Sequence, residues 1–127
     1  MEMQNGVLKS DYDALVALYN STGGDGWERN YGWMTEKPVN EWFGVNVDNG
    51  RVVELSLYGN RLTGMIPPQI GNLVKLTVLS LHKNNLTGMI PPEIGNLAEL
   101  TVLTLSDNQL TGGIPESVNL PNCKIYI

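Results

Sequence analysis

The chain has 127 residues, of which 42% are hydrophobic and 17% are charged, and its formal net charge is −5. This length suits one domain with a modest core, and the acidic balance argues against a nucleic-acid-binding protein, which needs a basic stripe. No apolar run is long enough to cross a bilayer as a helix, so membrane insertion is not expected. Residues 1–10 lack the apolar segment of a signal peptide, which favours a cytoplasmic protein; a secreted chain that begins at its mature end is the alternative.

Residues 10–19 are predicted to form a short helix. Ser10 and Asp13 have the spacing of a capping box, which satisfies free amides of the first helical turn. The apolar residues recur at helical spacing and share one face: Tyr12, Leu15, Leu18 and Tyr19. The glycine-containing run 21–24 ends the helix. We expect this helix to cover the open end of the repeats described below; partner binding through its apolar face is the alternative.

Three tryptophans, Trp27, Trp33 and Trp42, follow in a segment that has few other apolar residues. We interpret them as an aromatic cluster that packs an irregular loop, because a large ring buries much area. A carbohydrate-binding platform is the alternative. Asp25-Gly26 is interpreted as a turn, since the alternating acidic ligands of a calcium loop are missing.

Residues 44–55 are predicted to form a β-hairpin. Its strands, 44–47 and 51–55, flank Asn49-Gly50, a pair that supplies the two positive φ angles of a tight turn.

Residues 55–105 repeat one sequence with a period of 24 residues. Equivalent positions carry the same residue in each copy: Leu55, Leu79 and Leu103; Asn60, Asn84 and Asn108; Gly64, Gly88 and Gly112. A fixed period of this length indicates stacked supersecondary units.

Each unit must close into a coil. Leu79 and Leu81 alternate as in a strand, Pro91-Pro92 excludes a continuing helix, and Gly88 suits a tight bend. Stacking buries the flanks of neighbouring coils and aligns their strands in one parallel, concave sheet. The stacked asparagines at 60, 84 and 108 are expected to satisfy backbone groups from coil to coil. Asn72 and Asn96 are expected to do similar work on the other side.

The repeat pattern LxLxxNxLTGxIPxxIGNLxxL resembles the plant-type leucine-rich repeat. The resemblance implies an α/β fold: a right-handed leucine-rich repeat solenoid with a parallel concave β-sheet, a 3₁₀ or irregular convex side and a helical N-terminal cap. It also implies a second short strand in the LTGxIP phrase. We expect residues 1–51 to form the cap, and residues 52–127 to form three coils and the start of a fourth.

The phrase EWFGVNVDNGRVVELSL resembles the N-terminal cap of the same family. The family usually carries a cysteine pair there, and the corresponding positions are Asn40 and Val47. The resemblance therefore implies that this disulfide is absent, which again favours a cytoplasmic location.

Residues between the inward leucines should point outward from the concave sheet, where the resembled family recognises its partners. We predict partner contacts at these positions: Glu54, Ser56, Tyr58, Val78, Ser80, His82, Lys83, Val102, Thr104, Ser106 and Asp107. Tyr58 and His82 are the best anchors, because aromatic side chains carry interface energy more often than Ser or Thr. An ordinary solvated sheet is the alternative. His82 has no second ligand at a recognisable spacing, so neither a metal site nor catalysis is expected.

The C-terminal residues predict a fourth strand. Cys123 is interpreted as a small buried hydrophobe, and Ile125 and Ile127 are expected to point inward. No capping segment follows, so the last strand edge is expected to be open. The predictions are that the natural chain continues or that this edge binds another chain, including by self-association.

The function expected from these features is recognition of a protein or peptide by a non-catalytic module without cofactor or metal, because no catalytic arrangement is present. The alternative is a structural or surface-binding protein for ice or polysaccharide. Its basis is the regular spacing of Thr63, Thr87 and Thr111. Two glycosylation patterns, Asn20-Ser21-Thr22 and Asn85-Leu86-Thr87, would matter in a secreted protein.

Overall fold

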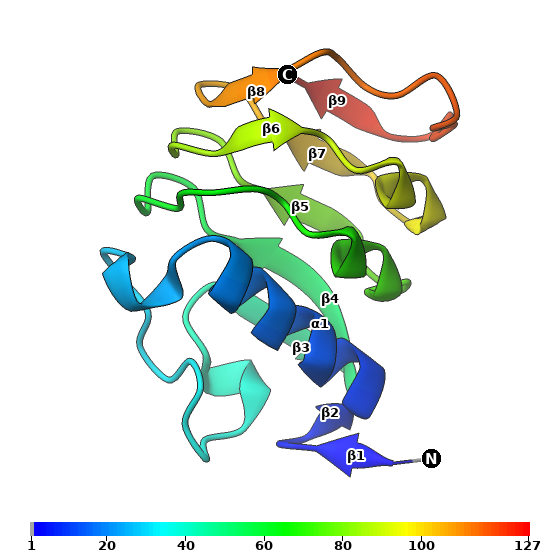
Figure 1. The fold of residues 1–127 in the computed structure, drawn as a ribbon. Coiled ribbons are helices and arrows are strands. Elements are labelled where there is room, and N and C mark those ends of the chain that lie inside the picture. The colour runs from blue at the N-terminus through cyan, green and yellow to red at the C-terminus, as the bar shows by residue number, and fades with distance from the viewer. Residues whose placement is uncertain (1) are drawn as a thin grey trace.

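A computed structural model describes residues 2–127 and shows a stack of coils with the chain termini at opposite ends (Figure 1). One five-stranded sheet runs through the stack in the order β3-β4-β5-β7-β9. Its strands are β3 (Val45–Asp48), β4 (Arg51–Ser56), β5 (Val78–Ser80), β7 (Val102–Thr104) and β9 (Lys124–Tyr126). β3 is antiparallel to β4, and the other pairs are parallel. The predicted solenoid with a parallel sheet is confirmed.

The other side of each coil carries short strands and 3₁₀ helices. The strands β6 (Thr87–Met89) and β8 (Gln109–Thr111) pair in parallel, as the resemblance implied. The 3₁₀ helices η3 (Pro68–Asn72) and η4 (Pro92–Asn96) each begin at the second proline of a pair, and the first proline is the N-cap residue. Proline suits that position because the amide it lacks would have no helical partner.

The leucines of successive coils form one continuous core. Leu55 pairs with Leu79 and Leu79 with Leu103 in the sheet, and all three are fully buried. The cap shares this core, because β3 pairs with β4 across the expected boundary at residue 51.

A ladder of asparagine side chains joins the coils behind the sheet. Asn84 is 7% exposed, and its Oδ1 accepts hydrogen bonds from the backbone N–H groups of Asn60 and Leu62, both at 2.9 Å. Its Nδ2 donates to the carbonyl oxygens of Leu57 and Leu81, both at 3.0 Å. The predicted structural role of these asparagines is confirmed.

The matching role expected for Asn72 and Asn96 is wrong. Both residues end a 3₁₀ helix with exposed side chains, and neither side chain makes a hydrogen bond to another of residues 2–127. The last turns of η3 and η4 are closed by backbone bonds, from Leu73 N–H to Ile70 and from Leu97 N–H to Ile94. No buried group is left there for an asparagine to satisfy.

The cap helix α1 (Lys9–Ser21) is longer than the predicted 10–19. Leu8, the last residue of strand β2, occupies the N-cap position, and no side chain of residues 2–127 caps the helix. The predicted capping box of Ser10 and Asp13 is therefore wrong: the Asp13 carboxylate accepts from Lys9 Nζ at 2.9 Å. The helix begins at Lys9, one residue before Ser10, because strand β2 leads directly into it. Ser10 therefore lies inside the first turn and not at the N-cap position.

A buried ion pair joins α1 to the first coil. Asp11 is fully buried and accepts hydrogen bonds from Arg51 Nε at 3.0 Å, Arg51 Nη2 at 3.2 Å and the Val52 N–H at 2.9 Å. The hydrogen bond with Asp11 raises the pKa of Arg51 above its usual value. This bidentate pair fixes the angle at which the helix covers the stack.

A second hairpin precedes the helix. Strands β1 (Met3–Gln4) and β2 (Val7–Leu8) flank Asn5-Gly6, whose φ angles are +48° and +86°. The predicted hairpin turn at Asn49-Gly50 has φ angles of +50° and +72°, so the two turns use the same geometry. Asn5 Nδ2 also donates to the carbonyl oxygens of Thr35 and Lys37, both at 3.0 Å, which fastens the cap loop.

The three tryptophans form a buried aromatic cluster, as predicted. Trp27, Trp33 and Trp42 are at most 5% exposed, and neighbouring ring centroids, including those of Tyr12 and Tyr19, are 4.8 to 5.9 Å apart. Each indole N–H donates to a backbone carbonyl: those of Thr22, Phe43 and Lys37. Two 3₁₀ turns, Gly24–Gly26 and Val39–Glu41, complete the loop. Buried rings with satisfied N–H groups are packing elements and leave no exposed platform for a sugar.

Candidate binding surface

The outward face of the five-stranded sheet carries two rows of side chains set by the strand register. One row contains Glu54, Val78, Val102 and Lys124, and the next contains Ser56, Ser80, Thr104 and Tyr126. The leucines between the rows point into the core, because successive side chains of a strand alternate between its faces. A short, parallel and rigid set of strands therefore presents these residues at fixed spacing.

A third row lies just beyond the strand ends and contains the predicted anchors. The rings of Tyr58 and His82 are stacked, with centroids 4.9 Å apart and planes inclined by 8°. His82 Nδ1 lies 2.9 Å from Thr104 Oγ1. Tyr58 is 57% exposed, so an aromatic face held by two coils is available to a partner. The coil following His82 places Ser106 at the equivalent position.

The rim of this surface is charged and bends sharply. Gly59, Lys83 and Asp107 occupy equivalent positions and have φ angles of +59°, +58° and +57°. The left-handed conformation is costly for residues other than glycine, so the fold imposes this bend at Lys83 and Asp107. Both side chains are exposed. At the opposite edge, Asn46 Nδ2 donates to Glu54 Oε1 at 2.7 Å.

The structure thus brings all eleven predicted residues to one face of the molecule, and it adds three that were missed. Asn46, Lys124 and Tyr126 lie in register with predicted residues, and Tyr126 is 53% exposed. The alternation around Ile125 was a signal that could have identified Lys124 and Tyr126. Asn46 lies in the cap, before the repeats, so the repeat pattern did not identify it.

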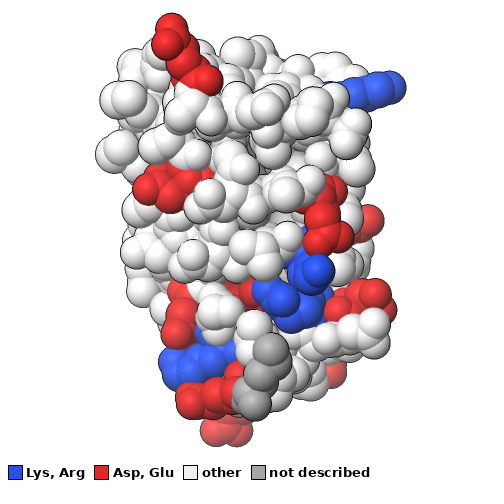
Figure 2. Space-filling view, turned by 90° about the vertical axis from the view of Figure 1, so that its right-hand side faces the viewer, with Lys and Arg blue, Asp and Glu red and all other residues white. Residues whose placement is uncertain are grey.

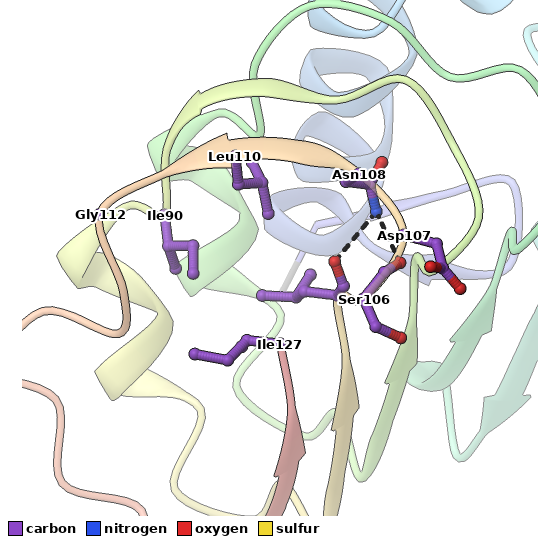
Figure 3. A pocket seen from close by; sticks show the side chains of 8 residues that line it. Ile90, Ser106, Asp107, Asn108, Leu110, Gly112 and Ile127 are labelled. Atoms are coloured by element: carbon purple, nitrogen blue, oxygen red, sulfur yellow. Dashed lines mark hydrogen bonds between the residues drawn. The ribbon is translucent and has the colours of Figure 1, made fainter.

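The last coils of the described stack enclose a hollow. A hollow of about 300 Å³ is lined by residues of the last coils, including Ile90, Leu110 and Ile127 (Figure 3). At one side of it, Asn108 Nδ2 donates to the carbonyl oxygens of Leu105 at 3.1 Å and Ser106 at 3.3 Å. The inward position predicted for Ile127 is only partly correct: the side chain lines the hollow, but it is 63% exposed.

Cys123 is half-buried in the last coil and packs against the core, as predicted. Burial raises the pKa of its thiol. A thiol in this environment is a packing group, because reactive cysteines have a lowered pKa.

Charged residues mark another face. Lys75 and Glu99 form an ion pair at 3.1 Å beside a hollow of about 300 Å³ that also includes Arg51. Figure 2 shows charged side chains gathered toward the cap end of one face, whereas the upper coils are mostly uncharged there. Within residues 2–127, no three His, Cys, Asp or Glu side chains gather closely enough to hold a metal ion, and none of the helices is long and apolar enough to cross a membrane.

The threonines behind the ice-binding alternative do not face one another. Thr87 lies opposite Gln109, and Thr111 lies opposite Met89. The second sheet is therefore offset by two residues between coils. A surface that matches a lattice needs threonine hydroxyls directly opposite one another on neighbouring strands. In this register, Thr87 and Thr111 are displaced from each other along the strand direction.

Comparison with known proteins identifies the repeats. A family model described as leucine rich repeat matches residues 50–110, and a second leucine-rich repeat model matches residues 99–123. Together they cover the stack from β4 almost to β9.

Similar solved structures include the PEPR1–AtPEP1 complex, with 29% sequence identity over 94% of this chain and 18% of the matched chain, and a TM-score of 0.79. The BIR3–SERK2 complex from Arabidopsis thaliana has 29% identity over 92% of this chain and 66% of the matched chain, with a TM-score of 0.72. The plant peptide hormone receptor RGFR1 in complex with RGF2 has 35% identity over 61% of this chain and 13% of the matched chain, with a TM-score of 0.56.

This chain thus spans less than two thirds of each matched chain. The resemblance noted in the sequence is confirmed by the family models and by the shared fold. The chain belongs to the leucine-rich repeat family, and its repeats are of the plant type.

Proposed function

We propose that this chain is a non-catalytic recognition module that binds an extended stretch of a protein or peptide on the outward face of its five-stranded sheet. The observation that carries the proposal is the stacked pair of Tyr58 and His82, which two coils hold beside the rows of Ser and Thr side chains. An exposed and immobilised aromatic face loses little conformational entropy on binding.

The rows fit an extended segment. Hydroxyl groups of Ser56, Ser80 and Thr104 lie in register along the sheet, beside the aromatic pair. Hydroxyls both donate and accept hydrogen bonds, so they suit the alternating N–H and C=O groups of a backbone. The charges at the rim, Lys83 and Asp107, would fix the direction of the bound segment.

The similar structures support this proposal. PEPR1 was solved with AtPEP1, BIR3 with SERK2, and RGFR1 with RGF2. A receptor for a peptide hormone meets its ligand outside the cell, so these similarities favour an extracellular location over the cytoplasmic one expected from the sequence. We include an extracellular location in the proposal.

The test is a binding screen of the whole chain against arrayed peptides and secreted proteins. The double variant Tyr58→Ala/His82→Ala should lose at least tenfold in affinity, about 1.4 kcal/mol, for any partner found. Met89→Ala is the matched control, because Met89 is 64% exposed on the second sheet. A partner whose affinity survives the double variant but drops with Met89→Ala would contradict the proposal.

A further inference from the structure

Two patterns of the form Asn-x-Thr are not used by the proposed binding surface: Asn20-Ser21-Thr22 and Asn85-Leu86-Thr87. This pattern is the acceptor for an N-linked glycan in secreted proteins. We propose that Asn85 is an N-glycan acceptor. The proposal rests on the extracellular location proposed above and on the structure around Asn85.

Asn85 has the surroundings of an accepting residue. It lies between β5 and β6 with an exposed side chain, and its amide makes no hydrogen bond to another of residues 2–127. Its backbone N–H donates to the Leu62 carbonyl at 2.8 Å, which holds the main chain against the preceding coil. A glycan on Nδ2 would therefore extend into solvent without breaking a contact of the fold.

The neighbouring asparagine shows how specific this arrangement is. Asn84 is buried, makes the ladder bonds on both sides and has leucine two positions later, so it is neither accessible nor part of the pattern. Thr87, the third residue of the Asn85 pattern, is exposed. Among residues 2–127, its hydroxyl makes one weak hydrogen bond, to the Gly64 carbonyl at 3.3 Å.

The position of Asn85 relates the glycan to binding. Equivalent positions in the neighbouring coils are Arg61 and Gln109, which are also exposed, so this column is a solvent-facing flank of the stack. Asn85 is two residues beyond Lys83 on the rim, on the way to strand β6. A glycan there would border the outward face on the rim side and leave the opposite edge, at Asn46 and Glu54, open to a partner.

The chemistry is a group transfer from a lipid-linked donor. A membrane-bound transferase of the secretory pathway would supply an oligosaccharide attached through its anomeric carbon to a polyprenyl pyrophosphate. The bond from that carbon to the pyrophosphate oxygen breaks, and a bond from the carbon to Asn85 Nδ2 forms. The amide nitrogen releases one proton to solvent, and the lipid pyrophosphate leaves with the electron pair of the broken bond. Nothing is oxidised or reduced.

Asn20 serves as an internal comparison. It is exposed in the last turn of α1, but the Thr22 hydroxyl of its pattern is fully buried and donates to the Leu18 carbonyl at 2.6 Å. Transfer to nascent chains can precede folding, so modification at Asn20 would report that the chain met the transferase.

The experiment expresses the whole chain behind a cleavable secretion signal in eukaryotic cells and maps glycans on the secreted protein by mass spectrometry. We expect a glycopeptide that contains position 85 and that peptide-N-glycosidase converts to an aspartate at that position. Asn85→Gln and Thr87→Ala should remove the modification, whereas Thr87→Ser should retain it. Gln109→Asn creates the same pattern on the third coil and should add a second glycan.

An unmodified Asn85 in the secreted protein would overturn the proposal, whether or not Asn20 is modified. Translation of the same signal-bearing chain into microsomes provides a second measurement that does not depend on export, and an unshifted gel band would have the same meaning. Failure here is distinct from failure of the proposed function, because the glycan map reads a covalent mass and not the binding of a partner.

Discussion

Single side chains that satisfy buried backbone groups carry much of the stability of this fold. Asn84 meets four such groups from two coils, and Asp11 meets the guanidinium of Arg51 together with one amide. An apolar side chain of similar size could fill either position, but it could not make these hydrogen bonds. Losing such a residue leaves buried polar groups without partners, which costs more than the bonds themselves.

Asn84→Ala should lower the free energy of unfolding by about 3 kcal/mol or more, because the N–H groups of Asn60 and Leu62 and the Leu57 carbonyl lose this partner inside the stack. The Leu81 carbonyl keeps a second hydrogen bond, from Asn108 Nδ2 at 2.9 Å. Urea denaturation followed by circular dichroism measures the change. Asn85→Ala, at the exposed neighbouring position, should stay within about 0.5 kcal/mol of the unaltered chain. A loss below about 1 kcal/mol for Asn84→Ala would mean that the ladder is dispensable.

Asp11→Asn should destabilise the chain by about 2 kcal/mol or more, since Arg51 would keep its charge near a buried amide. The cost is below that of a fully buried pair because Arg51 is partly exposed. Asp13→Asn, which breaks the exposed pair with Lys9, is the control and should change stability by at most about 0.5 kcal/mol. Equal effects of the two variants would contradict the structural role of the Asp11–Arg51 pair.

Tyr19 predicts a dependence of stability on alkaline pH. Burial, followed by the hydrogen bond its hydroxyl donates to Asp25 Oδ1 at 2.7 Å, raises the pKa of Tyr19 above its usual value of 10.0. The unfolded chain therefore loses this proton first as the pH rises, so the folded state binds more protons and stability falls above pH 10. The Tyr19→Phe variant should lose less stability between pH 9 and 11 than the unaltered chain; an identical decline would contradict this account.

The strands are short, and their alignment comes from the repeat more than from strand propensity. Each parallel strand of the coils after β4 has only three residues, yet the register keeps residues 24 apart side by side from β4 to β7. The second sheet instead pairs residues 22 apart, which shifts its side chains obliquely. The outward face of the first sheet is therefore the more regular surface, and this regularity favours it as the recognition face.

Within residues 2–127, strand β9 pairs on one side only, with β7, and its other edge lies by the hollow at Ile127. Such an edge is a site for pairing with another chain, so we predict that the apparent molar mass rises with concentration in light scattering. Ile127→Lys, which introduces a charge at the hollow, should reduce that rise, whereas the exposed-site control Met89→Lys should not. A constant monomer mass at all protein concentrations would contradict this prediction of self-association.

At the scale of the molecule, the sequence predicted the architecture because the repeat constrains it three times. The leucines, the asparagines at 60, 84 and 108 and the Asn49-Gly50 turn were each sufficient to place their element. The Asp11–Arg51 pair was not predictable, because its partners lie 40 residues apart and only the docking of the cap brings them together. The Asn5-Gly6 hairpin carried the same signal as Asn49-Gly50 but has strands of only two residues, too short for an alternation pattern.

The candidate surface was predicted in its centre and not at its borders. Tyr58 and His82 followed from the repeat columns, whereas Tyr126 required the register of an incomplete coil. The ring stacking and the bond to Thr104 depend on side-chain rotamers, which a repeat pattern does not specify. The proposed binding surface therefore combines a repeated scaffold with side chains that do not repeat.

The most direct test of the account is site-specific photo-crosslinking in the whole chain. A photoreactive phenylalanine analogue is placed at Ser80, in the middle of the outward rows, or at Met89 on the second sheet, and the chain is irradiated with the partner found in the binding screen. Recognition on the outward face predicts a covalent adduct from position 80 and none from position 89. An adduct that forms only from position 89 would contradict it, because recognition would then occur on the other face of the stack.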